Sequence, residues 1–139
     1  MEKYQHLATL LVRLALAAGF LSAVASRLSL WGKRSSGWTN FIAYTAQVNS
    51  FIPKNIVPAI AIASTVLETV LAIMLLIGYK TSYAAAGAAL LTLLFALAMS
   101  ISSGIKEPLD YSVFAFSAGA FLLATLPVCK WSVDSLLNN

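Results

Sequence analysis

The stretch NIVPAIAIASTVLETVLAIMLLIGY, residues 55–79, places the strictest limit on what this chain can fold into. It is long enough to cross a hydrocarbon layer of about 30 Å as one helix, and it carries one carboxylate, Glu68, near its middle. An ionisable group at that depth is costly unless it is paired, neutralised or turned towards a polar cavity. The stretch therefore predicts a membrane span whose Glu68 side chain has a polar partner.

The composition agrees with a protein that resides in the bilayer. Of the 139 residues, 60% are hydrophobic and only 10% are charged, so the chain lacks the polar residues that the surface of a soluble core needs. The formal net charge is +4, but the basic residues are scattered near the ends of apolar runs, which fits anionic lipid headgroups and not nucleic acid. We therefore expect one integral membrane domain over residues 1–139.

Four apolar segments predict an all-α, four-helix membrane bundle. The expected spans are residues 7–26, 56–78, 83–103 and 109–126. The turn at Lys80 is short enough to make the second and third spans antiparallel. The tripeptide Ala23-Val24-Ala25 also resembles a signal-peptidase site, so a cleaved first span stays an alternative.

The long connection between the first two spans is rich in aromatic residues. Phe41, Tyr44, Val48 and Phe51 recur at helical spacing, which predicts a short amphipathic helix over residues 39–50. Such a helix lies in the membrane interface, where Trp and Tyr side chains are favoured. It either anchors the protein to the membrane or forms a lid over a pocket between the spans.

Arg13 is the other charge that lies inside a comparably apolar segment. We therefore expect an intramembrane charge pair between Arg13 and Glu68, which fixes how the first two spans meet. The alternative is that Arg13 lies near the membrane boundary and extends its guanidinium to the headgroups. A buried pair that only fixes the packing of the helices is equally consistent with the sequence.

A ligand pocket, if there is one, is expected beside Glu68, because small and weakly polar residues surround it at helical spacing. Asp110 has a second interpretation, since an acidic residue in the first turn stabilises a helix terminus. The candidate lining residues are Ser64, Thr65, Thr92, Trp38, Tyr44, Asp110 and Tyr111.

The chain has few residues that carry redox or metal chemistry. A single cysteine, Cys129, excludes a dithiol cycle within the chain, and a single histidine, His6, cannot supply two axial ligands to a haem. No Cys, His and acidic residues have the spacing of a metal site, so we expect no metal.

Several motifs together resemble a known family. These are RLALAAGFLSAV, RLSLWG, GWTNFIAYTAQVNSFIP, the span TVLETVLAIMLLIG and GIKEPLDYSVF. In this order they are similar to the DoxX family of small four-helix bacterial membrane proteins, over nearly the whole chain. The family's Arg-x-x-Leu-Gly opening departs here, because Leu16 is followed by Ala17 and the glycine comes at Gly19. The resemblance implies a multi-pass protein of the bacterial inner membrane.

The resemblance leaves the activity open, since some members are similar to the membrane subunit of thiosulfate:quinone oxidoreductase and others are associated with redox-stress complexes. We rank first a non-catalytic membrane subunit or scaffold that docks a soluble or membrane partner enzyme. The second function is a quinone-binding component of an oxidoreductase, in which Glu68 and Arg13 handle protons or a carbonyl oxygen. The third is a carrier of a small solute or lipid, although no inverted repeat is evident.

The chain alone is expected to have no enzymatic activity, and any catalytic role is that of an oxidoreductase component. A quinone is the one cofactor that these interpretations consider. A homo-oligomer also stays open.

Overall fold

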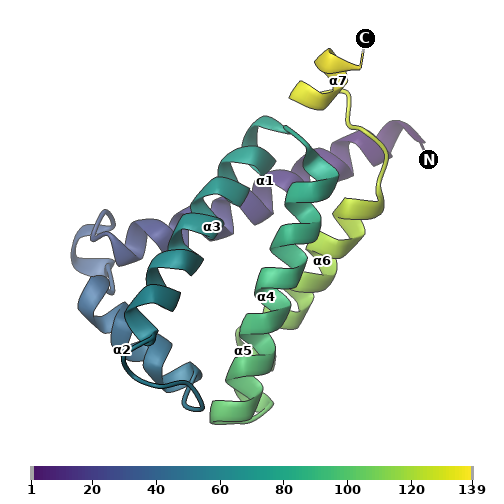
Figure 1. Cartoon of the computed structure of the whole chain (residues 1–139). Coiled ribbons are helices and arrows are strands. Elements are labelled where there is room, and N and C mark those ends of the chain that lie inside the picture. The colour runs from purple at the N-terminus through teal and green to yellow at the C-terminus, as the bar shows by residue number, and fades with distance from the viewer. Residues whose placement is uncertain (1, 139) are drawn as a thin grey trace.

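The computed structural model describes residues 2–138, with the backbone alone at Glu2. Over these residues the chain is helical and contains no strand, as the apolar segments predict (Figure 1). The helices are α1 (Glu2–Arg27), α2 (Trp38–Val48), α3 (Val57–Ile77), α4 (Thr81–Ser103), α5 (Lys106–Asp110), α6 (Val113–Thr125) and α7 (Val133–Leu137), and a 3-10 turn, η1 (Gly32–Arg34), precedes α2.

Three of the four predicted spans are single helices. α1, α3 and α4 contain 26, 21 and 23 residues. Each of them is long and apolar enough to cross a membrane. The chain is therefore a multi-pass membrane protein with a helical bundle.

The fourth predicted span, residues 109–126, is not one continuous helix. It is divided into α5 and α6 at Tyr111 and Ser112, where Ser112 has a left-handed φ of 56° that interrupts the helical hydrogen bonds. α6 contains 13 residues and is about 20 Å long, so it is shorter than the hydrocarbon layer. The prediction of an unbroken fourth span is wrong, and the break places Tyr111 at the pocket described below.

Small residues allow α4 to pack closely with its neighbours, as their run in the sequence suggests. Ala84, Ala85, Ala88 and Ala89 are buried, and α6 makes its main contacts with α4. The Ser117 hydroxyl on α6 donates a hydrogen bond of 2.8 Å to the Ala89 carbonyl. Close backbone approach and interhelical hydrogen bonds are what hold helices together in lipid, where apolar side chains gain little from leaving the acyl chains.

α1 and α2 together cover α3. α1 crosses α3 at an angle, with Arg13 against Gly78 at one end of α3 and Arg27 against Thr65 and Glu68 near its middle (Figure 1). α2 follows after η1 and packs against both α3 and α4. The long connection is therefore part of the bundle and not a slack linker.

The structure confirms a helix close to residues 39–50. The Tyr44 ring lies 6.5 Å from the Phe95 ring, and the Ser50 hydroxyl, just past α2, donates a hydrogen bond of 3.0 Å to Ser102. The two contacts follow in the same order along α2 and along α4. α2 therefore runs alongside the second half of α4 and not across its end. Its interfacial depth stays a prediction.

The C-terminal segment closes the opposite end of the bundle. The Asp134 carboxylate accepts hydrogen bonds of 2.6 and 2.8 Å from the backbone N–H groups of Lys80 and Thr81, at the N-terminus of α4. The Asp134 N–H donates in turn to the Gly78 carbonyl at 2.9 Å. Asp134 thus caps α4 from a distant part of the chain, because α4 has no side-chain cap of its own.

Burial raises the pKa of the Asp134 carboxyl, but hydrogen bonds from Thr81 and Lys80 and the positive charge of Arg13 outweigh it and hold this pKa below its ordinary value of 3.8. A carboxyl whose pKa is lower in the folded state stabilises that state above its unfolded pKa. This contribution is lost as the pH falls through the lowered folded pKa.

We predict that Asp134→Ala destabilises the docked C-terminal segment by about 1 kcal/mol at pH 7, since it removes a helix cap. Amide hydrogen exchange of the Lys80 and Thr81 N–H groups measures the change. Asp110→Ala is the matched control, because Asp110 is exposed and pairs with Lys106 on its own helix. In strong acid the Asp134 carboxyl is protonated in the parent, so the difference in amide exchange between Asp134→Ala and the parent should vanish. Equal exchange at pH 7 would contradict the capping role.

Candidate functional site

Glu68 lies on the inward face of α3. The buried residues of this helix recur at steps of three and four, and they are Val57, Ala61, Thr65, Glu68, Ala72 and Leu75. The opposite face carries Val66, Val70 and Ile73, which are exposed and face lipid. Glu68 is only 6% exposed, so the prediction that it points into the bundle is confirmed.

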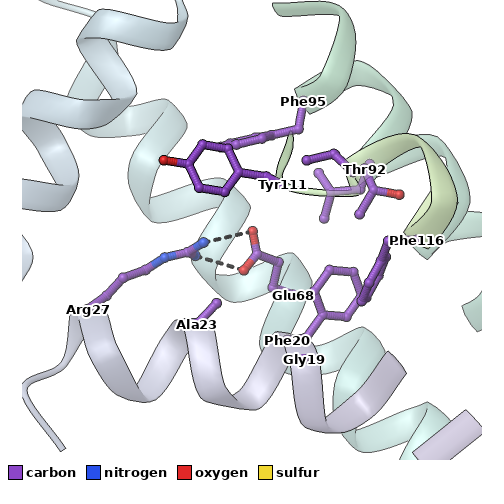
Figure 2. Close-up of a pocket in the computed structure, with 11 residues that line it drawn as sticks. Gly19, Phe20, Ala23, Arg27, Glu68, Thr92, Phe95, Tyr111 and Phe116 are labelled. Carbon is purple, nitrogen blue, oxygen red and sulfur yellow. Dashed lines mark hydrogen bonds and ion pairs between the residues drawn. The ribbon is translucent and has the colours of Figure 1, made fainter. Parts of the chain in front are cut away.

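Arg27 is the partner of Glu68. Its Nη1 lies 2.8 Å from Glu68 Oε2, and its Nη2 donates a hydrogen bond of 3.1 Å to Glu68 Oε1 (Figure 2). Nη1 also donates to the Thr65 hydroxyl at 3.1 Å, and the guanidinium lies 3.9 Å from the centre of the Phe41 ring. This buried ion pair therefore connects α1, α2 and α3 at a single point.

The predicted pair of Arg13 with Glu68 is wrong. Arg13 precedes Arg27 by four helical turns on α1, and its Nη2 instead donates a hydrogen bond of 2.6 Å to the Trp131 carbonyl. Arg13 is 3% exposed and lies under the C-terminal segment. Its depth relative to the headgroups stays a prediction. Arg13 lies near the middle of α1 and Arg27 is its last residue.

The sequence prediction omits Arg27 because the predicted first span, residues 7–26, ends one residue before it. The signal was present in the helical spacing. The buried face of α1 consists of Thr9, Arg13, Leu16, Ala17, Phe20, Val24 and Arg27, again at steps of three and four. Extending that face by one turn past Val24 places Arg27 inside the bundle.

A cavity of about 290 Å³ opens beside the ion pair. Figure 2 shows the pair between the Tyr111 and Phe95 rings on one side and the Phe20 and Phe116 rings on the other. The lining residues come from α1, α3, α4, α6 and the break before α6, and they are Gly19, Phe20, Ala23, Arg27, Glu68, Leu91, Thr92, Phe95, Tyr111, Val113 and Phe116. A mostly apolar wall with a few convergent polar groups is typical of a small-molecule pocket, and this volume is at the lower end of the usual ~300–1,000 Å³.

Two of the predicted lining residues, Thr92 and Tyr111, line this cavity. Thr65 lies behind it and supports Arg27 through its hydroxyl. Thr92 donates its own hydroxyl to the Ala88 carbonyl at 2.7 Å, so it presents mainly its methyl group and bulk to the pocket.

The other predicted lining residues lie outside the cavity wall. Tyr44 packs on Phe95, which lines the cavity, and Trp38 packs on Phe41, which lies over Arg27. Both aromatic residues therefore support the wall from α2 without forming it.

Ser64 donates its hydroxyl to the Ala61 carbonyl on its own helix. Asp110 is exposed and pairs with Lys106. Asp110 is the last residue of α5, so the prediction that it stabilises a helix from the first turn is wrong.

The ion pair keeps hydrogen-bonding capacity for a ligand. Glu68 Oε2 is buried, and among the described residues the donor beside it is Arg27 Nη1 at 2.8 Å, which leaves one of its two lone pairs unused. The contacts of Arg27 leave two of its five N–H groups for other acceptors. The site can therefore accept one hydrogen bond at Glu68 and donate one at Arg27.

Residues 2–138 contain no cluster of three His, Cys, Asp or Glu side chains that could hold a metal ion. Cys129 is buried, and its thiol lies 3.4 Å from the His6 carbonyl, far from the ion pair at the other end of α1.

The DoxX family model matches residues 8–101. The chain belongs to the DoxX family. The matched region contains Arg27 and Glu68, whereas Tyr111 and Phe116 of the pocket lie beyond it. No curated protein and no solved structure matches this DoxX chain.

The pair makes a sharp prediction for stability in detergent. Arg27→Leu leaves the Glu68 carboxylate buried without its partner, which should cost about 3–5 kcal/mol. Glu68→Gln should cost less. The Gln carbonyl oxygen can still accept a hydrogen bond from Arg27, and the Phe41 ring still lies over the guanidinium. The double variant should recover part of the sum, since removing the second partner also removes the stranded charge.

Thermal or denaturant unfolding of the four proteins measures this cycle. Arg13→Leu combined with Glu68→Gln is the control cycle, and its two effects should add. If the Arg27 and Glu68 substitutions were additive instead, the close contact would contribute no coupling and the assigned partner would be incorrect.

Proposed function

We propose that this DoxX protein is a membrane subunit that binds a small oxygen-bearing ring compound, a quinone first of all, beside Arg27 and Glu68. The observation that carries the proposal is the cavity between four aromatic rings with a buried ion pair at its polar side. Aromatic walls suit a flat ring, and the ion pair suits a ligand with polar oxygen atoms.

The hydrogen-bonding groups suit both forms of such a ring. A quinone carbonyl accepts an N–H bond from Arg27, and a hydroquinone hydroxyl donates to the carboxylate of Glu68, whose Oε2 has Arg27 Nη1 at 2.8 Å as its neighbouring donor and keeps a second lone pair. Glu68 is also the group that can hold a proton next to the ring oxygen. The ion pair would thus bind the ring and manage its proton, with Arg27 replacing Arg13 in this role.

Electrons must come from elsewhere. The chain has one cysteine and one histidine, so its own side chains offer neither a dithiol couple nor a pair of haem ligands. We therefore propose that a partner redox enzyme exchanges electrons with the ring, and that this chain is a component of that enzyme in a bacterial inner membrane. The chain alone would have no turnover.

A second candidate is a scaffold without a ligand, which we ranked first from the sequence. The same ion pair favours it, because Arg27 joins α1, α2 and α3 and so fixes the shape of the bundle. A scaffold would need this rigidity to present its surface to a partner enzyme. The two candidates differ in whether the cavity is occupied.

Photo-crosslinking with an azidoquinone in lipid nanodiscs tests the proposal. We expect labelling of peptides that contain Phe95 or Phe116, and competition by excess unlabelled quinone. Thr92→Leu should reduce this competable labelling about tenfold, because the larger side chain overfills the cavity.

Ala86→Leu is the matched control, since Ala86 is an exposed residue of the same helix and the added volume faces lipid. Labelling confined to lipid-facing residues such as Leu76, and unchanged by competitor, would reject the ligand and leave the scaffold.

A further inference from the structure

The outer face of α2 differs from the faces that the long helices expose. On α3 and α4 the exposed side chains include Ile62, Val66, Leu94 and Leu97, as expected for contact with lipid. On α2 and just past it the exposed side chains are small or polar instead. Four of them follow one another at steps of three and four and form what we call the α2 stripe, namely Asn40, Ala43, Gln47 and Ser50.

The α2 stripe starts deep along the bundle. Phe41, in the first turn of α2, lies over the guanidinium of Arg27, which pairs with Glu68. Glu68 lies eleven residues after the start of α3, which corresponds to about 16 Å of helix. The stripe ends at Ser50, which bonds to Ser102 next to the last residue of α4. α2 therefore extends from the middle of two membrane-crossing helices to one end of them (Figure 1).

Lipid cannot solvate the polar groups of this stripe. Asn40 and Gln47 carry amides, and an amide that faces hydrocarbon without a hydrogen bond is costly. Asn40 donates one N–H to the Ser36 carbonyl at 2.8 Å, which leaves its oxygen and its second N–H for other partners. Both amides are exposed, so the described part of the chain does not cover them. At this depth such a surface needs another protein surface or water beside it.

The spacing of the stripe indicates which surface covers it. Asn40 and Gln47 fall at the first position of a heptad, and Ala43 and Ser50 fall at the fourth. These two positions form the contact line of a parallel two-helix coil. Two copies of one membrane protein have the same orientation, so a two-fold axis along the membrane normal brings each residue of the stripe opposite itself.

The side chains of the stripe suit this self-contact. An amide both donates and accepts hydrogen bonds, so Gln47 is complementary to its own copy. Ala43 is small enough for two helix backbones to approach closely, as helices in lipid do. The stripe carries no charge, since Lys33 and Arg34 lie before it in η1.

We infer that the α2 stripe is the contact between two copies of this chain, in which Gln47 hydrogen-bonds to the second copy's Gln47. The opposite face of α2 supports the pocket, because Phe41 lies over Arg27 and Tyr44 packs on Phe95. Each pocket is therefore one helix away from the contact. The inference needs no ligand in the pocket and is independent of the proposed function.

Disulfide crosslinking in proteoliposomes at a low protein-to-lipid ratio tests the position of the contact. Cys129→Ser removes the one natural cysteine, and Ala43→Cys is then added. We expect copper phenanthroline to convert most of this variant to a covalent dimer, because the two copies of position 43 face each other. Ala63→Cys is the matched control, since Ala63 is an exposed alanine on the lipid face of α3, and it should give only the few dimers that collisions produce.

A charge exchange at position 47 tests the two-fold pairing. At about pH 8, where an exposed Glu is ionised, Gln47→Glu and Gln47→Lys each place like charges opposite each other. Each variant alone should associate at least about tenfold more weakly than the parent, and a mixture of the two should recover dimers through the opposite charges. Förster transfer between labelled copies measures association over a series of protein-to-lipid ratios, and thermal unfolding checks that both variants are folded.

The outcomes separate this contact from its alternatives. No dimer band for Ala43→Cys, or an equal band for Ala63→Cys, would overturn the contact. Dimers that persist in Gln47→Glu alone would mean that another surface joins the copies, and a mixture that stays monomeric would contradict the two-fold pairing. If the parent is monomeric at every ratio, the stripe faces water or another protein and the inference is wrong. Azidoquinone labelling is read separately, so the loss of the dimer would leave the proposed function standing.

Discussion

The ion pair between Arg27 and Glu68 is the interaction on which the arrangement of this bundle depends. A carboxylate in the middle of α3 needs an opposite charge, since burying it alone costs more than any single packing contact returns. Arg27 meets this need at the last residue of α1, which fixes where α1 crosses α3. The turn that follows and the start of α2 are then held at the same place, because Phe41 lies over the guanidinium.

The pocket follows from the same constraint. α1 crosses α3 at an angle to bring Arg27 to Glu68, while α6 packs mainly on the alanines of α4 and meets α1 at the Phe20 and Phe116 rings. The aromatic rings of Phe20, Phe95, Tyr111 and Phe116 border the space that results. Tyr111 takes part only because α5 and α6 are separate helices, so the break in the last apolar segment is a feature of the site.

The other end of the bundle is held differently. Asp134 caps α4 and Arg13 binds the Trp131 carbonyl, so the C-terminal segment is fixed by polar contacts to the α3–α4 turn and to α1. Hydrogen bonds between side chains and backbone groups hold the C-terminal segment, whereas an ion pair holds α1 to α3 at Glu68. Two buried arginines thus lie on one face of α1. Arg13 donates to a backbone carbonyl, and Arg27 pairs with a carboxylate.

Much of this arrangement was predictable from the sequence, and the failures have physical reasons. Hydropathy located three of the four predicted spans as single helices, and the spacing of Ala61, Thr65, Glu68 and Ala72 correctly placed Glu68 on the inward face, since helical periodicity is local information. The choice between Arg13 and Arg27 was not local: both lie on the buried face of α1, and only the crossing of α1 over α3 decides which one meets Glu68. The left-handed Ser112 and the cap from Asp134 also depend on tertiary contacts, which no periodicity records.

The identity of the partner of Glu68 is open to a direct measurement. The chain has arginines only at positions 13, 27 and 34, so solid-state NMR on protein with ¹⁵N-labelled arginine and ¹³C-labelled glutamate side chains can report their contacts one variant at a time. The Arg27 nitrogens lie 2.8 and 3.1 Å from the Glu68 oxygens, close enough for a strong dipolar coupling to the carboxylate carbon. We predict that this coupling persists in Arg13→Lys and disappears in both Arg27→Lys and Glu68→Gln. A coupling that survives Arg27→Lys and is lost in Arg13→Lys would contradict this account of the bundle.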